Sequence, residues 1–139
     1  METTVRWLSP MGFVAETGSG HALVLDGAEE FGGRNLGPRP MEMLLAGLGG
    51  CTNFDVMLML KKSRQNITAC DVKITAERAD NEPKVFTRIH VHFTVSGHEV
   101  DEKKVKRAID LSAEKYCSAS IMLGATAEIT HDFEIKPAA

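Results

Sequence analysis

Short alternating stretches of apolar and polar residues open the chain and predict three strands. Residues 3–8 and 13–17 are rich in β-branched and aromatic side chains, and a Ser-Pro-Met-Gly turn cluster at 9–12 separates them. A Gly-Ser-Gly turn at 18–20 then leads into a third apolar stretch at 21–25. Because short strands joined by tight turns pair with their neighbours, the N-terminal third is predicted to be an antiparallel meander.

The most apolar stretch of the chain predicts one long central helix. Residues 26–39 are glycine-rich, show no periodicity and predict a long loop, which in a compact domain is often functional. Residues 40–60 follow with a proline at the first helical position and strong helix formers after it, and lysines at 61–62 complement the helix dipole. Only Glu42 and Asp55 are charged before those lysines. A helix that is apolar nearly all round is buried on most sides, so we expect a partner subunit to cover it.

Two consecutive glycines lie in this helix directly before a cysteine. Gly49 and Gly50 each cost about 1 kcal/mol of helix stability relative to alanine, so some gain should offset the loss. Either they let another part of the chain approach closely, or they break the helix and place Cys51 near a new N-terminus, where the dipole favours a thiolate. The sequence leaves both alternatives open.

The next segment predicts a β-hairpin. After a polar connection at 63–68, residues 71–78 alternate in the manner of a strand with one wet face, and 80–83 form a turn. Residues 85–96 give the clearest alternation in the chain. Their predicted inner face holds Val85, Thr87, Ile89, Val91, Phe93 and Val95, and their outer face holds Phe86, Arg88, His90, His92, Thr94 and Ser96.

The C-terminal segment predicts a second helix and a last strand. Asp101 is a plausible N-cap for a helix that reaches about Tyr116, residues 118–123 continue as a short helical or irregular segment, and Gly124 ends it. Residues 126–135 then alternate as a strand. We find no repeat or linker, so the chain is predicted to be a single α+β domain spanning residues 1–139.

Composition excludes several classes of protein. With 139 residues, 43% of them apolar and 25% charged, the chain has the make-up of an ordinary globular domain. A net charge of −3 argues against a nucleic-acid partner. A membrane span through the apolar stretch is disfavoured because the stretch contains Glu42, Asn53 and Asp55. The N-terminus has neither the basic region nor the apolar region of a secretory signal, which favours the cytoplasm.

The candidate chemistry lies in the cysteines. Three cysteines at irregular spacing do not form a secreted disulfide framework. Cys51 and Cys117 lie 66 residues apart, each attached to a predicted helix. They are either small core residues or a redox pair, and the glycines before Cys51 and the polar run around Cys117 favour the pair. Cys70 begins a strand in no such context and is predicted to be structural.

Other kinds of site find little support. His90 and His92 share one strand face and could bind a metal with a third ligand, but Arg88 and Thr94 lie on the same face, which favours a solvated surface. The sequence contains no Cys-x-x-Cys pair, no Gly-x-Ser-x-Gly nucleophile turn and no phosphate-binding glycine loop. The residues by themselves therefore support neither a metal site nor a nucleotide-binding site.

Two segments together resemble a known family. Pro40-Met-Glu-Met-Leu-Leu-Ala-Gly-Leu-Gly-Gly-Cys51 and Ala113-Glu-Lys-Tyr-Cys117-Ser118 resemble the paired cysteine motifs of the OsmC/Ohr family, the osmotically inducible and organic hydroperoxide resistance proteins. The resemblance covers almost the whole chain. It implies an α+β fold in which antiparallel sheets pack around two long central helices, in an intertwined homodimer with its active sites at the subunit interface.

The resemblance also implies thiol peroxidase chemistry that needs no metal and no tightly bound organic cofactor. Cys51 would attack an organic hydroperoxide as a thiolate and become a sulfenic acid, Cys117 would condense with it to a disulfide, and a dithiol reductant, often a dihydrolipoyl group in this family, would restore both thiols. Family members usually carry a glutamate directly after the motif proline, close to an arginine. Here Met41 follows the proline and Glu42 comes next, which indicates a divergent subgroup.

The supporting residues and a second function remain open in the sequence. Glu42 and Arg39 are the candidates for the family's glutamate and arginine, with Arg34, Arg6 and Arg88 as other candidates for the cation. The displaced glutamate motivates the alternative that the chain is a non-catalytic protein that binds an apolar small molecule at the dimer interface.

Overall fold

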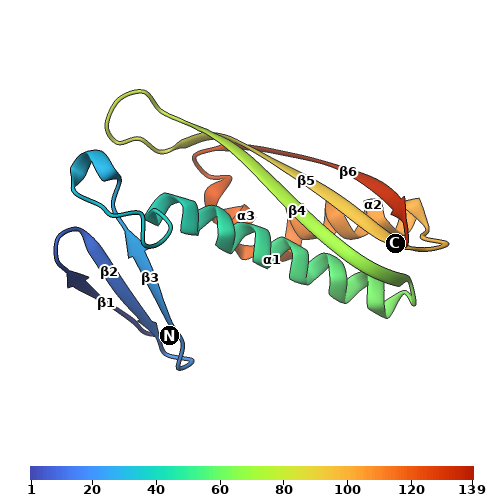
Figure 1. Ribbon diagram of the computed structural model, residues 1–139. Helices are drawn as coiled ribbons and strands as arrows, with labels where there is room; N and C mark the ends of the chain where they lie inside the picture. The colour runs from blue at the N-terminus through green and yellow to red at the C-terminus, as the bar shows by residue number, and fades with distance from the viewer. The chain divides into compact units, whose positions relative to one another are not determined.

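The N-terminal strands form the predicted meander. The computed structural model describes residues 1–139, which divide into two compact units, Met1–Ala46 and Gly47–Ala139 (Figure 1). In the first unit β1 (Thr3–Leu8), β2 (Gly12–Thr17) and β3 (Ala22–Asp26) pair antiparallel in the order β1-β2-β3. Each strand lies within one residue of its predicted bounds.

The loop after β3 is organised by one buried carboxylate. Asp26 accepts backbone N–H groups from Gly27 at 2.8 Å, Arg34 at 3.0 Å and Leu36 at 3.1 Å, and a single 3₁₀ turn, η1 (Glu29–Phe31), lies between them. The hydrogen bonds from Leu36 and Arg34 are the main causes that hold the pKa of Asp26 below its usual value. A segment without periodicity thus becomes ordered because its amide groups converge on an ionised side chain.

The central helix α1 (Pro40–Lys62) is continuous through both glycines. The alternative that Gly49 and Gly50 break the helix before Cys51 is therefore wrong. The alternative of a close approach holds for Gly49, where a Cβ atom would lie only 3.1 Å from Ile74 Cδ1. Gly50 faces open space instead.

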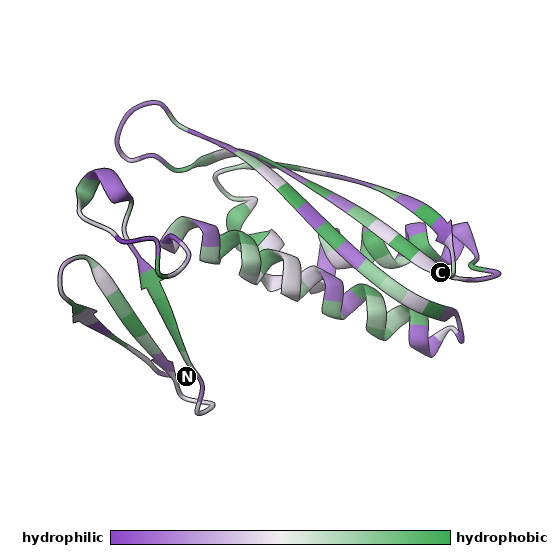
Figure 2. Cartoon of the chain, viewed as in Figure 1, coloured by the Kyte–Doolittle hydropathy of each residue, from purple (hydrophilic) through white to green (hydrophobic).

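The apolar surface of α1 is only partly covered within one chain. Leu48, Thr52, Val56 and Leu60 are its buried residues and recur at every fourth position, which defines one packed face. Phe54 is 68% exposed and Leu58 is 42% exposed, and Figure 2 shows apolar residues along most of the helix. By length and composition alone α1 could cross a membrane, with 22% of its most apolar window buried in the chain. The prediction that α1 is buried on most sides is not met by a single chain.

The second unit packs helices on one face of a mixed sheet. Strands β4 (Asn66–Arg78), β5 (Phe86–His98) and β6 (Glu128–Pro137) are ordered β4-β5-β6. The β4–β5 hairpin is antiparallel as predicted, whereas β6 is parallel to β5 because the chain returns through a helical crossover. Figure 1 shows that the sheet lies across α1 and the crossover helices. The core holds Leu48, Val56, Leu60, Ile89, Val91, Phe93, Val95, Val105, Ala108 and Ile109.

The crossover follows the predicted order of elements. Helix α2 (Glu102–Leu111) begins after Asp101, whose side chain accepts the Lys103 N–H at 2.9 Å as an N-cap. A π-helical turn, η2 (Ser112–Tyr116), and the short helix α3 (Ser118–Leu123) follow it.

Two boundaries in the hairpin differ from the prediction. Strand β4 starts at Asn66, so part of the predicted polar connection is a strand that pairs with the end of β5. Near the start of β5 the register shifts at Thr87, because Glu77 pairs with Arg88 and Arg78 pairs with Phe86. This bulge reverses the alternation, so Phe86 is buried while Val85 and Thr87 are exposed. The predictions that Phe86 faces outward and that Val85 and Thr87 face inward are wrong.

Histidines on β5 pair with carboxylates on β6. Asp132 Oδ1 lies 2.9 Å from His90 Nε2 and 2.7 Å from His92 Nδ1, and Glu134 Oε1 lies 3.3 Å from His92 Nε2. The contacts with Asp132 and then Glu134 raise the pKa of His92, and the same contacts lower the pKa of both carboxyls. The two histidines therefore belong to a solvent-facing ladder of ion pairs between the parallel strands.

This ladder predicts a pH dependence of stability. A histidine whose pKa is raised by folding stabilises the folded state below about pH 6.5, and this stabilisation is lost as pH rises through the folded-state pKa. The carboxyls, whose pKa values are lowered by folding, stabilise it above about pH 4.5, and their contribution is lost as pH falls. The ladder contribution is therefore greatest between about pH 5 and 6.5. We expect the urea midpoint to fall from about pH 6 to pH 8 in the wild type and to fall less in His92→Asn. His98→Asn, at the end of β5, is the control, and an equal pH effect in His92→Asn and the wild type would contradict the assignment.

Candidate functional site

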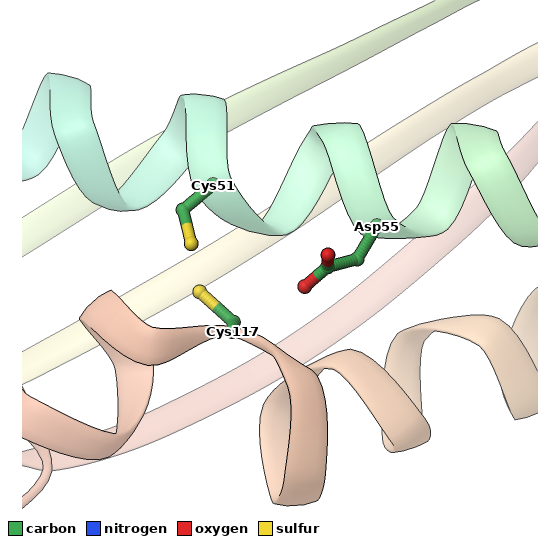
Figure 3. A group of neighbouring side chains, drawn as sticks. All are labelled: Cys51, Asp55 and Cys117. Atoms are coloured by element: carbon green, nitrogen blue, oxygen red, sulfur yellow. The ribbon is translucent and has the colours of Figure 1, made fainter.

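Two cysteines and one aspartate meet between α1 and the crossover. The ligand atoms of Cys51, Asp55 and Cys117 all lie within 4.8 Å of one another, and the two sulfur atoms face each other as free thiols (Figure 3). Cys51 and Asp55 are one helical turn apart, so both project from the same face of α1. Cys117 lies where η2 ends and α3 begins. The fold thus brings together the two cysteines that lie 66 residues apart in sequence.

Cys117 is held rigidly by its backbone and surroundings. Its side chain is fully buried, its N–H donates to Ser112 O at 2.8 Å, and its Sγ accepts the Ser120 N–H at 3.3 Å. Burial is the main cause that raises the pKa of Cys117, with a smaller contribution from the neighbouring Cys51 thiol and an opposing one from Ser120. Cys117 therefore favours the neutral thiol, while Cys51 is only half-buried.

Asp55 is fixed by a chain of hydroxyl groups. Ser112 is fully buried, and its Oγ donates to Asp55 Oδ2 at 3.0 Å. Thr52 Oγ1 lies 2.8 Å from Ser112 Oγ. Since the Ser112 hydrogen is used by the carboxylate, Thr52 is the donor in that second bond. The π-helical turn that starts at Ser112 places this hydroxyl and Cys117 on the same side, and such turns are frequent at functional sites.

Sequence reasoning missed Asp55 and Ser112 as parts of the site. Asp55 entered only as one of two charges on an apolar helix, although its spacing of four residues from Cys51 predicts a shared helix face. Ser112 falls within the helix predicted to reach about Tyr116, and nothing in the sequence distinguishes it there. No local signal identifies its partner, because the Ser112–Asp55 hydrogen bond joins residues 57 positions apart.

A groove opens beside Asp55. It has a volume of about 600 Å³, and its walls combine apolar side chains with three cationic ones. This pairing suits a ligand with an apolar body and a polar or anionic end. The lining residues are Asp55, Leu58, Met59, Lys62, Ser63, Lys104, Arg107, Ala108, Leu111 and Tyr116.

The third cysteine has a different environment. Cys70 lies on β4, half-buried, and its burial, with a smaller effect of Asp71, raises its pKa to about 11. A thiol with that pKa stays protonated and unreactive at neutral pH. This environment is consistent with the structural role predicted for Cys70.

The predicted supporting residues Arg39 and Glu42 have local partners at the start of α1. Glu42 Oε1 accepts the Arg39 backbone N–H at 2.8 Å, which is the glutamate half of a capping box. The Arg39 guanidinium donates to Gly37 O at 3.0 Å and to Asn35 Oδ1 at 3.2 Å. Glu42 therefore stabilises the helix N-terminus, and a catalytic role for either residue stays a prediction.

Comparisons with known proteins agree on one family. Residues 32–132 match the family described as OsmC-like protein. Protein YhfA of Escherichia coli strain K12 is 42% identical over 138 residues, which are 99% of this chain and 100% of that protein. The crystal structure of a hypothetical protein from Aquifex aeolicus VF5 superposes with a TM-score of 0.87 at 28% identity, over 99% of this chain and 97% of that one.

Organic hydroperoxide resistance proteins share the fold at lower identity. OhrB of Bacillus subtilis is 17% identical and superposes with a TM-score of 0.64, over 96% of each chain. The predicted α+β fold with two sheets and central helices is confirmed by these structures.

The capping contact predicts how Glu42 affects stability. Glu42→Ala removes the acceptor for the Arg39 N–H and should lower the free energy of unfolding by about 0.5–2 kcal/mol. Glu42→Gln keeps a carbonyl oxygen at the same place and should change it little. Urea unfolding of both variants measures the difference. An equal loss in the two variants would show that the negative charge, and not the acceptor, is what stabilises the helix.

Proposed function

This chain belongs to the OsmC-like protein family, and from that premise we propose that it is a cysteine-based thiol peroxidase that reduces organic hydroperoxides. One observation carries the proposal: the Cys51 and Cys117 sulfur atoms face each other within 4.8 Å (Figure 3). The names of more distant structural neighbours, organic hydroperoxide resistance proteins, agree with it.

The proposed cycle uses the two thiols in sequence. The Cys51 thiolate attacks the terminal oxygen of the hydroperoxide, the O–O bond breaks, and the alkoxide takes a proton and leaves as an alcohol. Cys51 is then a sulfenic acid. The Cys117 thiol condenses with it to form the disulfide and release water. A dithiol, such as a dihydrolipoyl group, reduces the disulfide and is itself oxidised.

The surroundings of the two sulfurs support this assignment of roles. Cys51 is half-buried and therefore open to a substrate, whereas Cys117 is fully buried and its pKa is raised. A protonated, enclosed thiol is a poor first nucleophile but is well placed to attack a sulfenic acid beside it. Formation of the disulfide requires the two sulfurs to approach to about 2 Å, a movement that side-chain rotation can supply.

Arg39 and Glu42 complete the proposed site by resemblance. We propose that the Arg39 guanidinium is the cation of the site and that Glu42 supports it through the hydrogen bond to the Arg39 backbone N–H. Loss of the guanidinium in an Arg39→Gln variant would therefore slow peroxide reduction.

The groove beside Asp55 supports an organic substrate and also a second function. Its apolar walls and three cationic side chains suit the body of an organic hydroperoxide, and Asp55 is the residue that the groove shares with the cysteine site. The same groove favours the alternative that the chain binds an apolar small molecule without converting it.

We propose that two copies of the chain form a homodimer through α1. Phe54 and Leu58 are one helical turn apart and expose 68% and 42% of their surface, although both are large and apolar. Ile121 and Met122 on α3 add 53% and 76% exposed side chains. Exposed large apolar side chains of this kind are typical of a subunit interface when they gather in one patch.

Mass spectrometry and peroxide assays test the cysteine roles. After treatment with cumene hydroperoxide, we expect a 51–117 disulfide in the wild type. Cys51→Ser should consume no peroxide above the buffer rate, and Cys117→Ser should accumulate a sulfenic acid at Cys51 that dimedone traps. Cys70→Ser is the matched control and should behave as the wild type.

Other outcomes separate the two functions. Unchanged peroxide consumption in Cys51→Ser would overturn the peroxidase. In that case, saturable binding of a fluorescent fatty-acid probe by the wild type would support the binding function instead.

Light scattering tests the dimer. We expect the wild type to elute with twice the mass of the 15.2 kDa chain. Phe54→Lys should shift it to the monomer, because burial of a lysine charge in an apolar interface is unfavourable. Val85→Lys, a 40% exposed position between β4 and β5, is the control and should stay dimeric. A monomeric wild type at micromolar concentration would contradict the proposal.

A further inference from the structure

The geometry points to a metal site made of the same three side chains: we propose that Cys51, Cys117 and Asp55 bind one Zn²⁺ ion, with a fourth coordination position open to solvent or ligand. The inference uses the cysteine site but does not rest on the peroxidase function, since metal binding requires only the reduced thiols. The proposal also gives a role to Asp55, a residue that takes no part in the peroxidase cycle.

The separations fit a single tetrahedral ion. All three ligand atoms lie within 4.8 Å of one another. Zinc bonds of about 2.3 Å to sulfur and about 2.0–2.2 Å to oxygen place the two sulfurs about 3.8 Å apart and each sulfur about 3.5–3.7 Å from the oxygen. A contraction of about 1 Å therefore closes the site. Figure 3 shows the side chains of Cys51 and Cys117 pointing toward each other and Asp55 beside them.

The donor set selects the metal. Two thiolates and one carboxylate combine soft and hard ligands, which suits Zn²⁺, whereas Mg²⁺ and Ca²⁺ prefer oxygen ligands throughout. The ion also offsets the negative charges that three such groups would otherwise place within 4.8 Å of one another. Both thiol protons leave when the metal binds, so binding strengthens as pH rises.

Hydrogen bonds around the ligands complete the site. The Ser112 hydroxyl donates to Asp55 Oδ2 and leaves Oδ1 for the metal, and Thr52 in turn donates to Ser112. Ser112 is fully buried, and Thr52 is 4% exposed. Outer contacts of this kind orient a carboxylate ligand before the metal arrives. Cys117 is similarly fixed by its contacts with Ser112 O and Ser120 N.

Metal binding and thiol oxidation exclude each other at this site. A zinc-bound Cys51 sulfur has its lone pair engaged, which slows its attack on electrophiles, and a 51–117 disulfide has no thiolate to offer the metal. The reduced protein therefore binds Zn²⁺, and oxidation of the pair to the disulfide by a two-electron oxidant such as diamide releases it.

Cobalt spectroscopy and alkylation test the site in the full-length, untagged, reduced protein without oxygen. Titration with Co²⁺ should produce thiolate-to-cobalt charge-transfer bands and visible bands of a tetrahedral ion, saturating at one metal per chain and bleached by Zn²⁺. With Zn²⁺ bound, alkylation of Cys51 by iodoacetamide should slow at least about tenfold, and EDTA should restore it.

Variants separate the ligands from the rest of the chain. Cys51→Ser and Cys117→Ser should abolish the charge-transfer bands, and Asp55→Asn, which keeps the shape and an acceptor for Ser112, should weaken Zn²⁺ binding about tenfold or more. Cys70→Ser and His92→Asn should bind as the wild type does. Circular dichroism shows whether each variant folds. A further control needs no mutation: wild-type protein in which diamide has formed the 51–117 disulfide should no longer bind the metal.

The outcomes are distinct from those of the peroxidase test. Absence of charge-transfer bands in the reduced wild type, or binding that survives Cys51→Ser or Asp55→Asn unchanged, would overturn the zinc site. Zinc binding by a protein that does not reduce hydroperoxides would sustain the site and refute only the peroxidase.

Discussion

The site depends on the buried hydrogen bonds that join α1 to the crossover. Thr52 donates to Ser112, and Ser112 donates to Asp55, so three polar groups inside a mostly apolar unit satisfy one another. A buried hydroxyl without a partner costs about 1–3 kcal/mol, which makes any other register of the two elements unfavourable. Because Cys51 directly precedes Thr52 and Cys117 follows Ser112 by one π-helical turn, the same contacts fix the two sulfurs opposite each other.

A carboxylate lies beside the thiol pair. Asp55 is within 4.8 Å of both sulfurs and would attract a cation that stabilises both thiolates. The proposed peroxidase cycle and the proposed zinc-bound form would therefore compete for one pair of sulfurs. The state of the site would follow the supply of metal and of oxidant.

The arrangement of the strands could be predicted because local patterns carry it. Alternation over 85–96 correctly predicted which residues face inward from Ile89 to Val95, and the capping residue Asp101 correctly predicted where α2 begins. The same rule failed at Phe86, since a bulge belongs to the pairing of two strands and one strand alone does not specify it. The parallel pairing of β6 also depends on the path of the crossover, which periodicity does not encode.

The sequence by itself determined the elements, the two cysteines worth pairing and the family they resemble, because periodicity, capping residues and short motifs are local properties. Only the tertiary structure decided that α1 runs unbroken through its glycines, that Glu42 accepts the Arg39 amide, and that Asp55 and Ser112 join the cysteines. The physical reason is that a contact between residues about 60 positions apart depends on packing between elements, and no pattern within either element specifies its partner.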